Sequence, residues 1–131
     1  MKLLRIAIVM STCAGLLLAA CADGDSNAGG TVSSPALVGD ATAGKMVYEG
    51  TCVACHGPGA VGITGLGKDW TVSDFIRNNS DADLMAFIKQ GRLTTDSDNT
   101  TGVDMPAMGG NNALTDKDLA DVIAYMRTVQ K

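Results

Sequence analysis

Two cysteines and a histidine stand together in this sequence as Cys52, Cys55 and His56. Thiolates and imidazoles are metal ligands, and two cysteines at this spacing can also do dithiol redox chemistry. A tetrahedral zinc site needs a fourth ligand, but His56 is the only histidine, and the other cysteines, Cys13 and Cys21, precede the expected domain. A thioredoxin-like dithiol follows a strand of a parallel sheet, and the sequence pattern predicts no such sheet. Zinc and dithiol chemistry are therefore both disfavoured.

The order Cys-x-x-Cys-His resembles the attachment motif of c-type haem. Two thiols three residues apart near the end of a helix can each reach one vinyl group of the same porphyrin. The adjacent imidazole then comes beneath the iron. The sequence thus predicts that Cys52 and Cys55 carry one haem c through thioether bonds, with His56 as an iron ligand.

The sixth iron ligand has to come from another residue type, because the sequence contains one histidine only. Methionine is the natural candidate, and Met105 and Met108 are the methionines that fall on a predicted loop of the domain. Met46 and Met126 fall within predicted helices, where a packing role in the core is expected. Since Pro106 restricts the backbone of the residue before it, Met105 is the favoured ligand and Met108 the alternative.

With these motifs, the chain from about residue 40 to 131 resembles a class I monohaem cytochrome c. The resemblance implies an all-α fold of about four helices wrapped around one covalently attached haem. It also implies that the first and last helices cross, with Gly44 and Tyr48 against Tyr125. The implied activity is one-electron transfer rather than enzymatic catalysis, because histidine and methionine together occupy both axial positions of the iron.

The loop after the motif departs from the family. Members usually have a Gly-Pro pair there, whose carbonyl accepts the second N–H of the proximal histidine, and this chain has Ile63, Thr64, Gly65 and Leu66 instead. Some acceptor for His56 is still expected. The resemblance further suggests that the indole N–H of Trp70 contacts a haem propionate, although packing in the core would equally explain this residue.

The pattern of apolar residues predicts helices and no sheet. Four helices are expected, with N-caps at Asp40, Thr71, Ser80 and Thr115. The first runs into the Cys52 region, and Thr71 forms a capping box with Asp74 in the second. The third stops at Gly91, and the last continues to the end of the chain. Two loops, 57–69 and 92–113, connect these helices.

The first 20 residues indicate export. A basic start, an apolar stretch and small residues before Cys21 resemble the signal of a bacterial lipoprotein, in which the cysteine becomes the acylated N-terminus. Ordinary secretory cleavage and an uncleaved anchor helix are the alternatives. Residues 1–20 are thus interpreted as a signal peptide, 21–38 as an acylated N-terminus and flexible linker, and 39–131 as the cytochrome c domain. The protein is expected in the periplasm or on the outer face of the cytoplasmic membrane, held by lipid.

The charge balance excludes one class of partner. The chain has 10 basic and 14 acidic residues, so no basic stripe is available to bind nucleic acid. Aromatic residues make up 4% of the chain, which is little for so small a core, and a buried porphyrin would supply the missing apolar mass.

The expected function is that of a membrane-tethered carrier of single electrons in a respiratory or photosynthetic chain. The expected redox partners are a quinol-oxidising complex or dehydrogenase and a terminal oxidase. One alternative is a fixed haem subunit of such a complex, and another is a gas-binding or peroxidase-like haem protein with an open sixth site.

Overall fold

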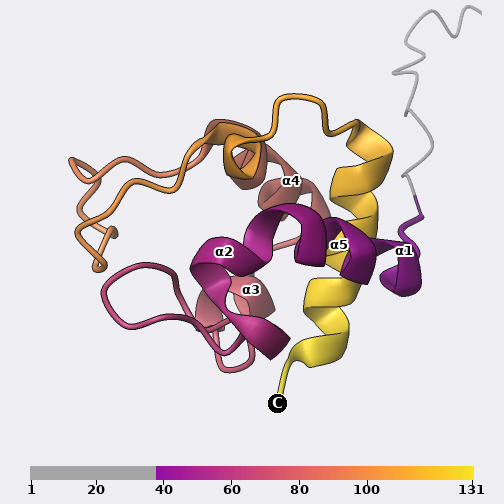
Figure 1. The fold of residues 1–131 in the computed structure, drawn as a ribbon, viewed down its shortest axis with the longest axis horizontal. Helices are drawn as coiled ribbons and strands as arrows, with labels where there is room; N and C mark the ends of the chain where they lie inside the picture. Colours follow the sequence, from indigo (N-terminus) through magenta and orange to yellow (C-terminus); the bar gives the residue numbers. More distant parts are fainter. Residues whose placement is uncertain (1–37) are drawn as a thin grey trace, which may run out of the picture. The chain divides into compact units, whose positions relative to one another are not determined.

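The computed structural model describes residues 38–131, so the expected export signal and Cys21 lie outside the described residues. The helices of this part are α1 Ala41–Val47, α2 Val53–His56, α3 Asp74–Asn78, α4 Asp81–Gln90 and α5 Asp116–Val129 (Figure 1). Short 3-10 turns occupy Pro58–Ala60 and Ala107–Gly110. Strand pairing within 38–131 is confined to two isolated bridges, which confirms the all-α prediction. No helix of this part is both long and apolar enough to cross a membrane.

The first predicted helix is continuous but not uniform. It begins after Asp40, whose carboxylate accepts the N–H groups of Thr42 and Ala43, as expected for an N-cap. A π-helical turn, Tyr48–Cys52, then joins α1 to α2, and the helix ends where Gly57 adopts a positive φ of 74°. One-turn π insertions of this kind often occur at functional sites. Here the turn lies immediately before the cysteine pair.

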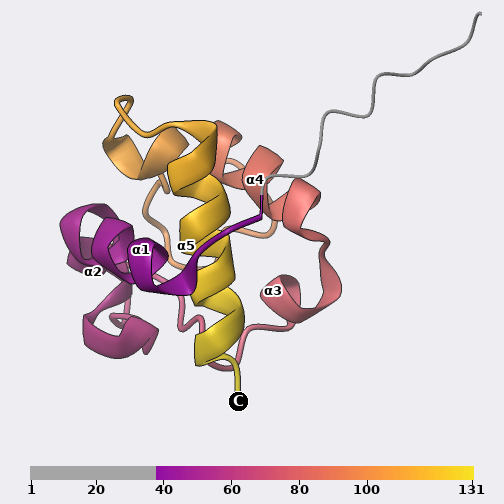
Figure 2. The same cartoon turned by 90° about the vertical axis from the view of Figure 1, so that its right-hand side faces the viewer.

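Helices α1 and α5 cross at close range, as the resemblance implied (Figures 1 and 2). Gly44 makes the approach possible, because a Cβ atom built on it would lie 1.9 Å from the carbonyl oxygen of Asp121. Beside it, the rings of Tyr48 and Tyr125 have centroids 5.3 Å apart. The buried Asp121 side chain also accepts the backbone N–H of Asp40 at 2.6 Å, so the start of α1 is fastened to α5.

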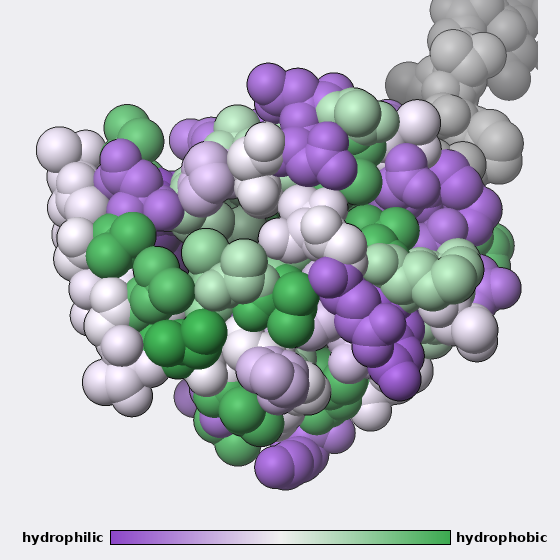
Figure 3. Space-filling model, in the orientation of Figure 1, coloured by the Kyte–Doolittle hydropathy of each residue, from purple (hydrophilic) through white to green (hydrophobic). Residues whose placement is uncertain are grey.

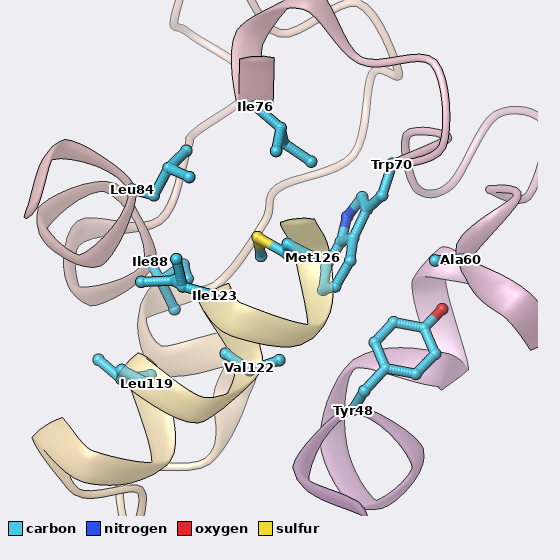
Figure 4. Packing of buried hydrophobic residues seen from close by; sticks show 10 residues of the cluster. All are labelled: Tyr48, Ala60, Trp70, Ile76, Leu84, Ile88, Leu119, Val122, Ile123 and Met126. Carbon is cyan, nitrogen blue, oxygen red and sulfur yellow. The ribbon is translucent and has the colours of Figure 1, made fainter. Parts of the chain in front are cut away.

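The hydrophobic core gathers around the buried face of α5 (Figure 4). This face consists of Leu119, Val122, Ile123 and Met126, whose spacing of three or four residues places them on one side of the helix. The remaining members come from the first half of the domain and from α3 and α4, and they are Tyr48, Ala60, Trp70, Ile76, Leu84 and Ile88. The predicted packing role of Met126 is therefore confirmed.

Met46, in contrast, is 66% exposed, so the core role predicted for it is wrong. It lies between Gly44 of α1 and Tyr48 at the start of the π-helical turn, and those two residues face α5. A residue halfway between them on a helix of 3.6 residues per turn has to project from the opposite side.

Helices α4 and α5 begin as predicted. Ser80 with Asp83 and Thr115 with Asp118 form complete capping boxes, and α4 ends at Gly91 with a positive φ. The side chain of Arg127 on α5 fixes the corner before α4. It donates to the carbonyl of Asn79 at 2.6 Å and pairs with Asp81 at 2.7 Å.

The predicted cap of the second helix is wrong. Ser73, not Thr71, is the N-cap of α3, and its hydroxyl accepts the N–H of Ile76 at 3.3 Å. Both the N–H and the hydroxyl of Thr71 donate to the Asp69 carboxylate at 2.7 Å. A nearby carboxylate upstream thus takes the donors that the sequence pattern assigned to a capping box with Asp74.

The approach of α1 to α5 leads to a mutational prediction. Gly44→Ala should lower the free energy of unfolding by at least about 2 kcal/mol, because the new methyl group meets backbone rather than a side chain that can move. The measurement is urea unfolding followed by circular dichroism. Gly50→Ala is the matched control, since no atom lies within 4 Å of a Cβ there, and its stability should be unchanged or up to about 1 kcal/mol higher. Equal losses in both variants would contradict the packing argument.

Candidate functional site

A cavity of about 570 Å³ opens within the fold, between α2, both long loops and the core. This volume falls in the range of pockets that bind organic ligands. The apolar part of the lining includes Phe75, Ile76, Leu84, Phe87, Ile88, Leu119, Val122 and Met126. On the face in Figure 3, hydrophobic residues gather around a recess in the surface. The site is therefore suited to a large and mainly apolar group.

The cysteine and histidine residues of the motif meet at this cavity. Cys52, Cys55 and His56 all line it, because the last turn of the helix carries them together. Burial, and next to it the neighbouring Cys55, raises the pKa of the Cys52 thiol to about 11. The raised pKa disfavours the thiolate form of Cys52, and the thiolate is the form of a cysteine that does dithiol redox chemistry. Within residues 38–131 no three His, Cys, Asp or Glu side chains form a group that could hold a metal ion.

His56 is oriented by the backbone of Lys68. Its Nδ1 lies 2.8 Å from the Lys68 carbonyl oxygen, and since a carbonyl can only accept, Nδ1 carries the proton. The lone pair on Nε2 is then free to bind a metal ion. Burial lowers the pKa of His56, and the hydrogen bond to Lys68 partly offsets this, so the neutral ring is the prevailing form at neutral pH.

The sequence alone does not show which carbonyl orients His56, and the geometry of loop 57–69 explains why it is that of Lys68. Loop 57–69 folds back at the bridge between Ile63 and Gly67, and then passes directly against α2. A Cβ on Gly67 would lie 2.2 Å from the Cys55 carbonyl oxygen, so only glycine permits this approach. The next carbonyl, that of Lys68, arrives at the imidazole. Gly67 is the signal in the sequence that could have located the acceptor.

Both candidate methionines line the cavity. Met105 exchanges two backbone hydrogen bonds of 2.8 Å with Arg92, which anchors it to the segment that follows α4. Gly91 makes room for this pairing, because a Cβ there would lie 2.3 Å from the Met105 carbonyl oxygen. Met108 lies in the turn Ala107–Gly110 with a positive φ of 56°, which is uncommon for a residue other than glycine. The two positions therefore differ in how their backbones are held.

Trp70 lines the cavity and is also part of the core. Its ring packs on His56 at a centroid distance of 4.7 Å and edge-on against Tyr48 at 4.9 Å. The phenol of Tyr48 donates to the carbonyl of Gly57, the residue after the motif histidine, and burial raises its pKa to about 12. Figure 4 shows Tyr48 and Trp70 together within the core, and through their contacts with Gly57 and His56 they hold the motif from that side.

A covalently bound haem fits these residues. The cavity offers apolar walls for a porphyrin, two thiols at one edge, an imidazole with a free Nε2 and thioether side chains on the later loop. The class of protein that such a site defines is the monohaem c-type cytochrome, which transfers electrons and does not catalyse a reaction of its own.

Comparison with known proteins agrees with this class. The family described as cytochrome c oxidase, cbb3-type, subunit III matches residues 39–126, and the chain belongs to it. The chain is a class I monohaem cytochrome c that carries haem c.

Individual relatives are cytochromes of similar size. Cytochrome c-555 of Chlorobaculum tepidum is 34% identical over 95 residues, which are 72% of this chain and 82% of that protein. Cytochrome c-555 of Prosthecochloris aestuarii is 32% identical over 98 residues, 66% of this chain and 85% of that protein. Cytochrome c-554(547) of Halothiobacillus neapolitanus is 32% identical over 94 residues, 70% of this chain and 99% of that protein. No solved structure matches.

The Asp69 carboxylate beside Trp70 gives a pH-dependent prediction. The hydroxyl of Thr71, and after it the Thr71 N–H, hold the pKa of Asp69 below its ordinary value of 3.8. A lowered pKa in the folded state contributes stability above the ordinary pKa and loses it as the pH falls through the lowered value. Asp69→Asn should therefore be less stable than the parent at neutral pH, and the difference should close at a pH below 3.8.

Urea unfolding followed by the fluorescence of Trp70, the single tryptophan of the chain, measures this difference at each pH. A stability difference that keeps its size down to strongly acidic pH would mean that the Asp69 side chain acts through its shape and not through its charge.

Proposed function

We propose that this protein is a membrane-tethered carrier of single electrons, with Cys52 and Cys55 as the thioether attachments of its haem and His56 and Met105 as the iron ligands. The observation that carries the proposal is the arrangement around His56. The Lys68 carbonyl directs the Nε2 lone pair, and both cysteines line the same apolar cavity. A histidine held in this way is a metal ligand that needs no further rearrangement.

Met105 is the proposed sixth ligand because its backbone is the better anchored of the two. Paired hydrogen bonds to Arg92 restrain it on both its N–H and its carbonyl side. Pro106 adds a fixed φ of −68° directly after it. A thioether on such a restrained segment loses little further freedom when it binds iron.

In electron transfer, the role of the protein is to hold the haem and to set its reduction potential. Haem c, when bound, takes up and releases one electron at its iron. Apolar side chains from α3, α4 and α5 keep water from the cavity, which disfavours the more highly charged oxidised state and raises the potential. With His56 and Met105 as its ligands, the iron would have no open position for a substrate. Redox partners would then exchange single electrons with the bound group.

A fixed subunit of a quinol-oxidising, dehydrogenase or oxidase complex is the second candidate. It is favoured by one observation, that the family matched by residues 39–126 is described as a subunit of an oxidase. Purification in detergent separates the two candidates. A carrier elutes alone, whereas a subunit elutes with its partners in a fixed ratio.

Substitution of the two loop methionines tests the iron ligand. Oxidised protein should show the weak charge-transfer band of methionine-ligated haem at the red end of the visible spectrum. The band should disappear in Met105→Ala and remain in Met108→Ala, because only the first removes the sulfur ligand. Loss of the band in Met108→Ala alone would assign the ligand to Met108. Carbon monoxide should leave the spectrum of the reduced parent unchanged, and a rapid shift would favour a gas-binding protein with an open sixth site.

The proposed tether depends on Cys21, which lies outside the described residues. Its support is the sequence pattern alone, an apolar stretch followed by small residues and a cysteine. Acylation by at least two chains would hold the protein on the membrane, since one chain gives only marginal binding. The domain would then stand on the outer side of the cytoplasmic membrane, on a linker rich in Gly and Ser.

Cys21→Ser should abolish incorporation of labelled fatty acid and move the protein from the detergent phase to the aqueous phase in a phase-partition experiment. Cys13→Ser is the matched control, because Cys13 lies within the expected signal and should leave both results unchanged. A parent protein that takes up no label would reject the lipid anchor and favour ordinary secretory cleavage.

A further inference from the structure

Arg92 places a cation in the wall of the cavity. It follows Gly91, the residue that ends α4, and its side chain is 20% exposed. The guanidinium carbon lies 5.1 Å from the centre of the Phe75 ring and 4.8 Å from that of Phe87. Aromatic faces stabilise a cation by electrostatics, but they leave its N–H groups without hydrogen-bond acceptors. The position of Arg92 therefore calls for an acceptor in addition to the two rings.

Part of the Arg92 guanidinium is in fact buried without a hydrogen-bond partner. Among the side-chain nitrogen and oxygen atoms of residues 38–131, the Nε of Arg92 is the buried one that has no hydrogen-bond partner. The Asp96 carboxylate lies 3.4 Å from Nε, close enough for an ion pair, yet the two do not form a hydrogen bond. A buried donor left unsatisfied is destabilising, and more so when it is charged.

Lys68 also lines the cavity, but its ammonium group is engaged. It donates to the hydroxyl of Thr100 on the later loop. His56 likewise uses its Nδ1 proton on the carbonyl of Lys68. Of these basic side chains around the cavity, Arg92 is the one with a buried donor still free for an anion.

We propose that Arg92 binds a propionate carboxylate of the haem. This assignment rests on the proposed function, in which haem c occupies the cavity. A porphyrin of this type is apolar except for its two propionates, and a planar guanidinium matches a carboxylate with two parallel hydrogen bonds. The backbone of Arg92 is paired with Met105, so one short segment holds both the iron ligand and the carboxylate partner.

The charged groups around Arg92 determine how its replacement by a neutral residue would affect a bound propionate. Asp96 faces it from the later loop, Phe75 faces it from α3 and Phe87 from α4. The other charged side chains that line the cavity are Lys68, Asp69, Asp98 and Asp104. With four carboxylates present and Lys68 engaged, a propionate without Arg92 would have little positive charge beside it. It would then bind a proton more readily, and oxidation of the iron would become coupled to release of that proton.

The test compares two variants that each lose one positive charge, Arg92→Met and Lys89→Met. Lys89 is 42% exposed and pairs with Asp116 at 2.6 Å, outside the cavity lining. In Arg92→Met the propionate should bind its proton about tenfold more tightly or more. The midpoint potential of Arg92→Met, measured by redox titration of the haem absorbance, should therefore fall with rising pH. Over the same pH range the midpoint potentials of the parent and of Lys89→Met should not change.

Mass spectrometry of the denatured chains separates the failure of this proposal from that of the proposed function. A parent chain without the added mass of haem would overturn the function itself. Haem-loaded Arg92→Met with the same potential profile as Lys89→Met would overturn the role of Arg92 and leave the function standing. Should Arg92→Met fail to mature, Arg92→Lys decides, because it keeps the charge and loses the planar pair of donors. In Arg92→Lys the midpoint potential should again fall with rising pH, but by less than in Arg92→Met. A pH dependence equal to that of the parent would overturn the proposal.

Discussion

The core of this domain is arranged around a cavity of about 570 Å³ whose walls are mostly apolar. Apolar walls that face water are unfavourable by about 25 cal/mol for each Å² of apolar surface, so a group that covers these walls stabilises the folded domain. The fold therefore depends on a large apolar group in its centre, and a covalently bound haem meets this need in a chain with few aromatic residues of its own.

Short-range contacts of the backbone place the residues around that cavity. Gly44 lets α1 meet α5, Gly67 lets loop 57–69 meet α2, and Gly91 lets the methionine loop meet the end of α4. In each case an added Cβ would collide with backbone atoms. Three glycines thus act where segments distant in sequence have to touch, and the motif, the imidazole acceptor and Met105 are positioned by these approaches.

The two long loops are also connected with each other. Lys68 supplies the carbonyl for His56, and its ammonium group reaches Thr100 on the loop that leads to Met105. Arg92 pairs with Met105 through the backbone and faces the cavity with its side chain. The two segments that carry the proposed iron ligands are therefore not independent. A change at one of them is expected to be felt at the other, since coupled positions rarely respond additively.

The amino-acid sequence by itself determined the all-α class, three of the four helix starts, and the residues with the chemistry to hold haem. These are properties of local pattern: capping side chains act within one turn, and a Cys-x-x-Cys-His run is contiguous. Only the tertiary structure decided that Ser73 caps α3, that Met46 faces outward, that Lys68 orients His56 and that Arg92 faces the cavity. The last three of these depend on which segment lies opposite, and such contacts join residues whose separation along the chain carries no periodic signal. The cap of α3 instead follows from Asp69, which accepts the hydrogen bonds of Thr71. Short-range interactions along the chain therefore determine the helices and the haem-binding motif, and tertiary packing determines which residues come into contact.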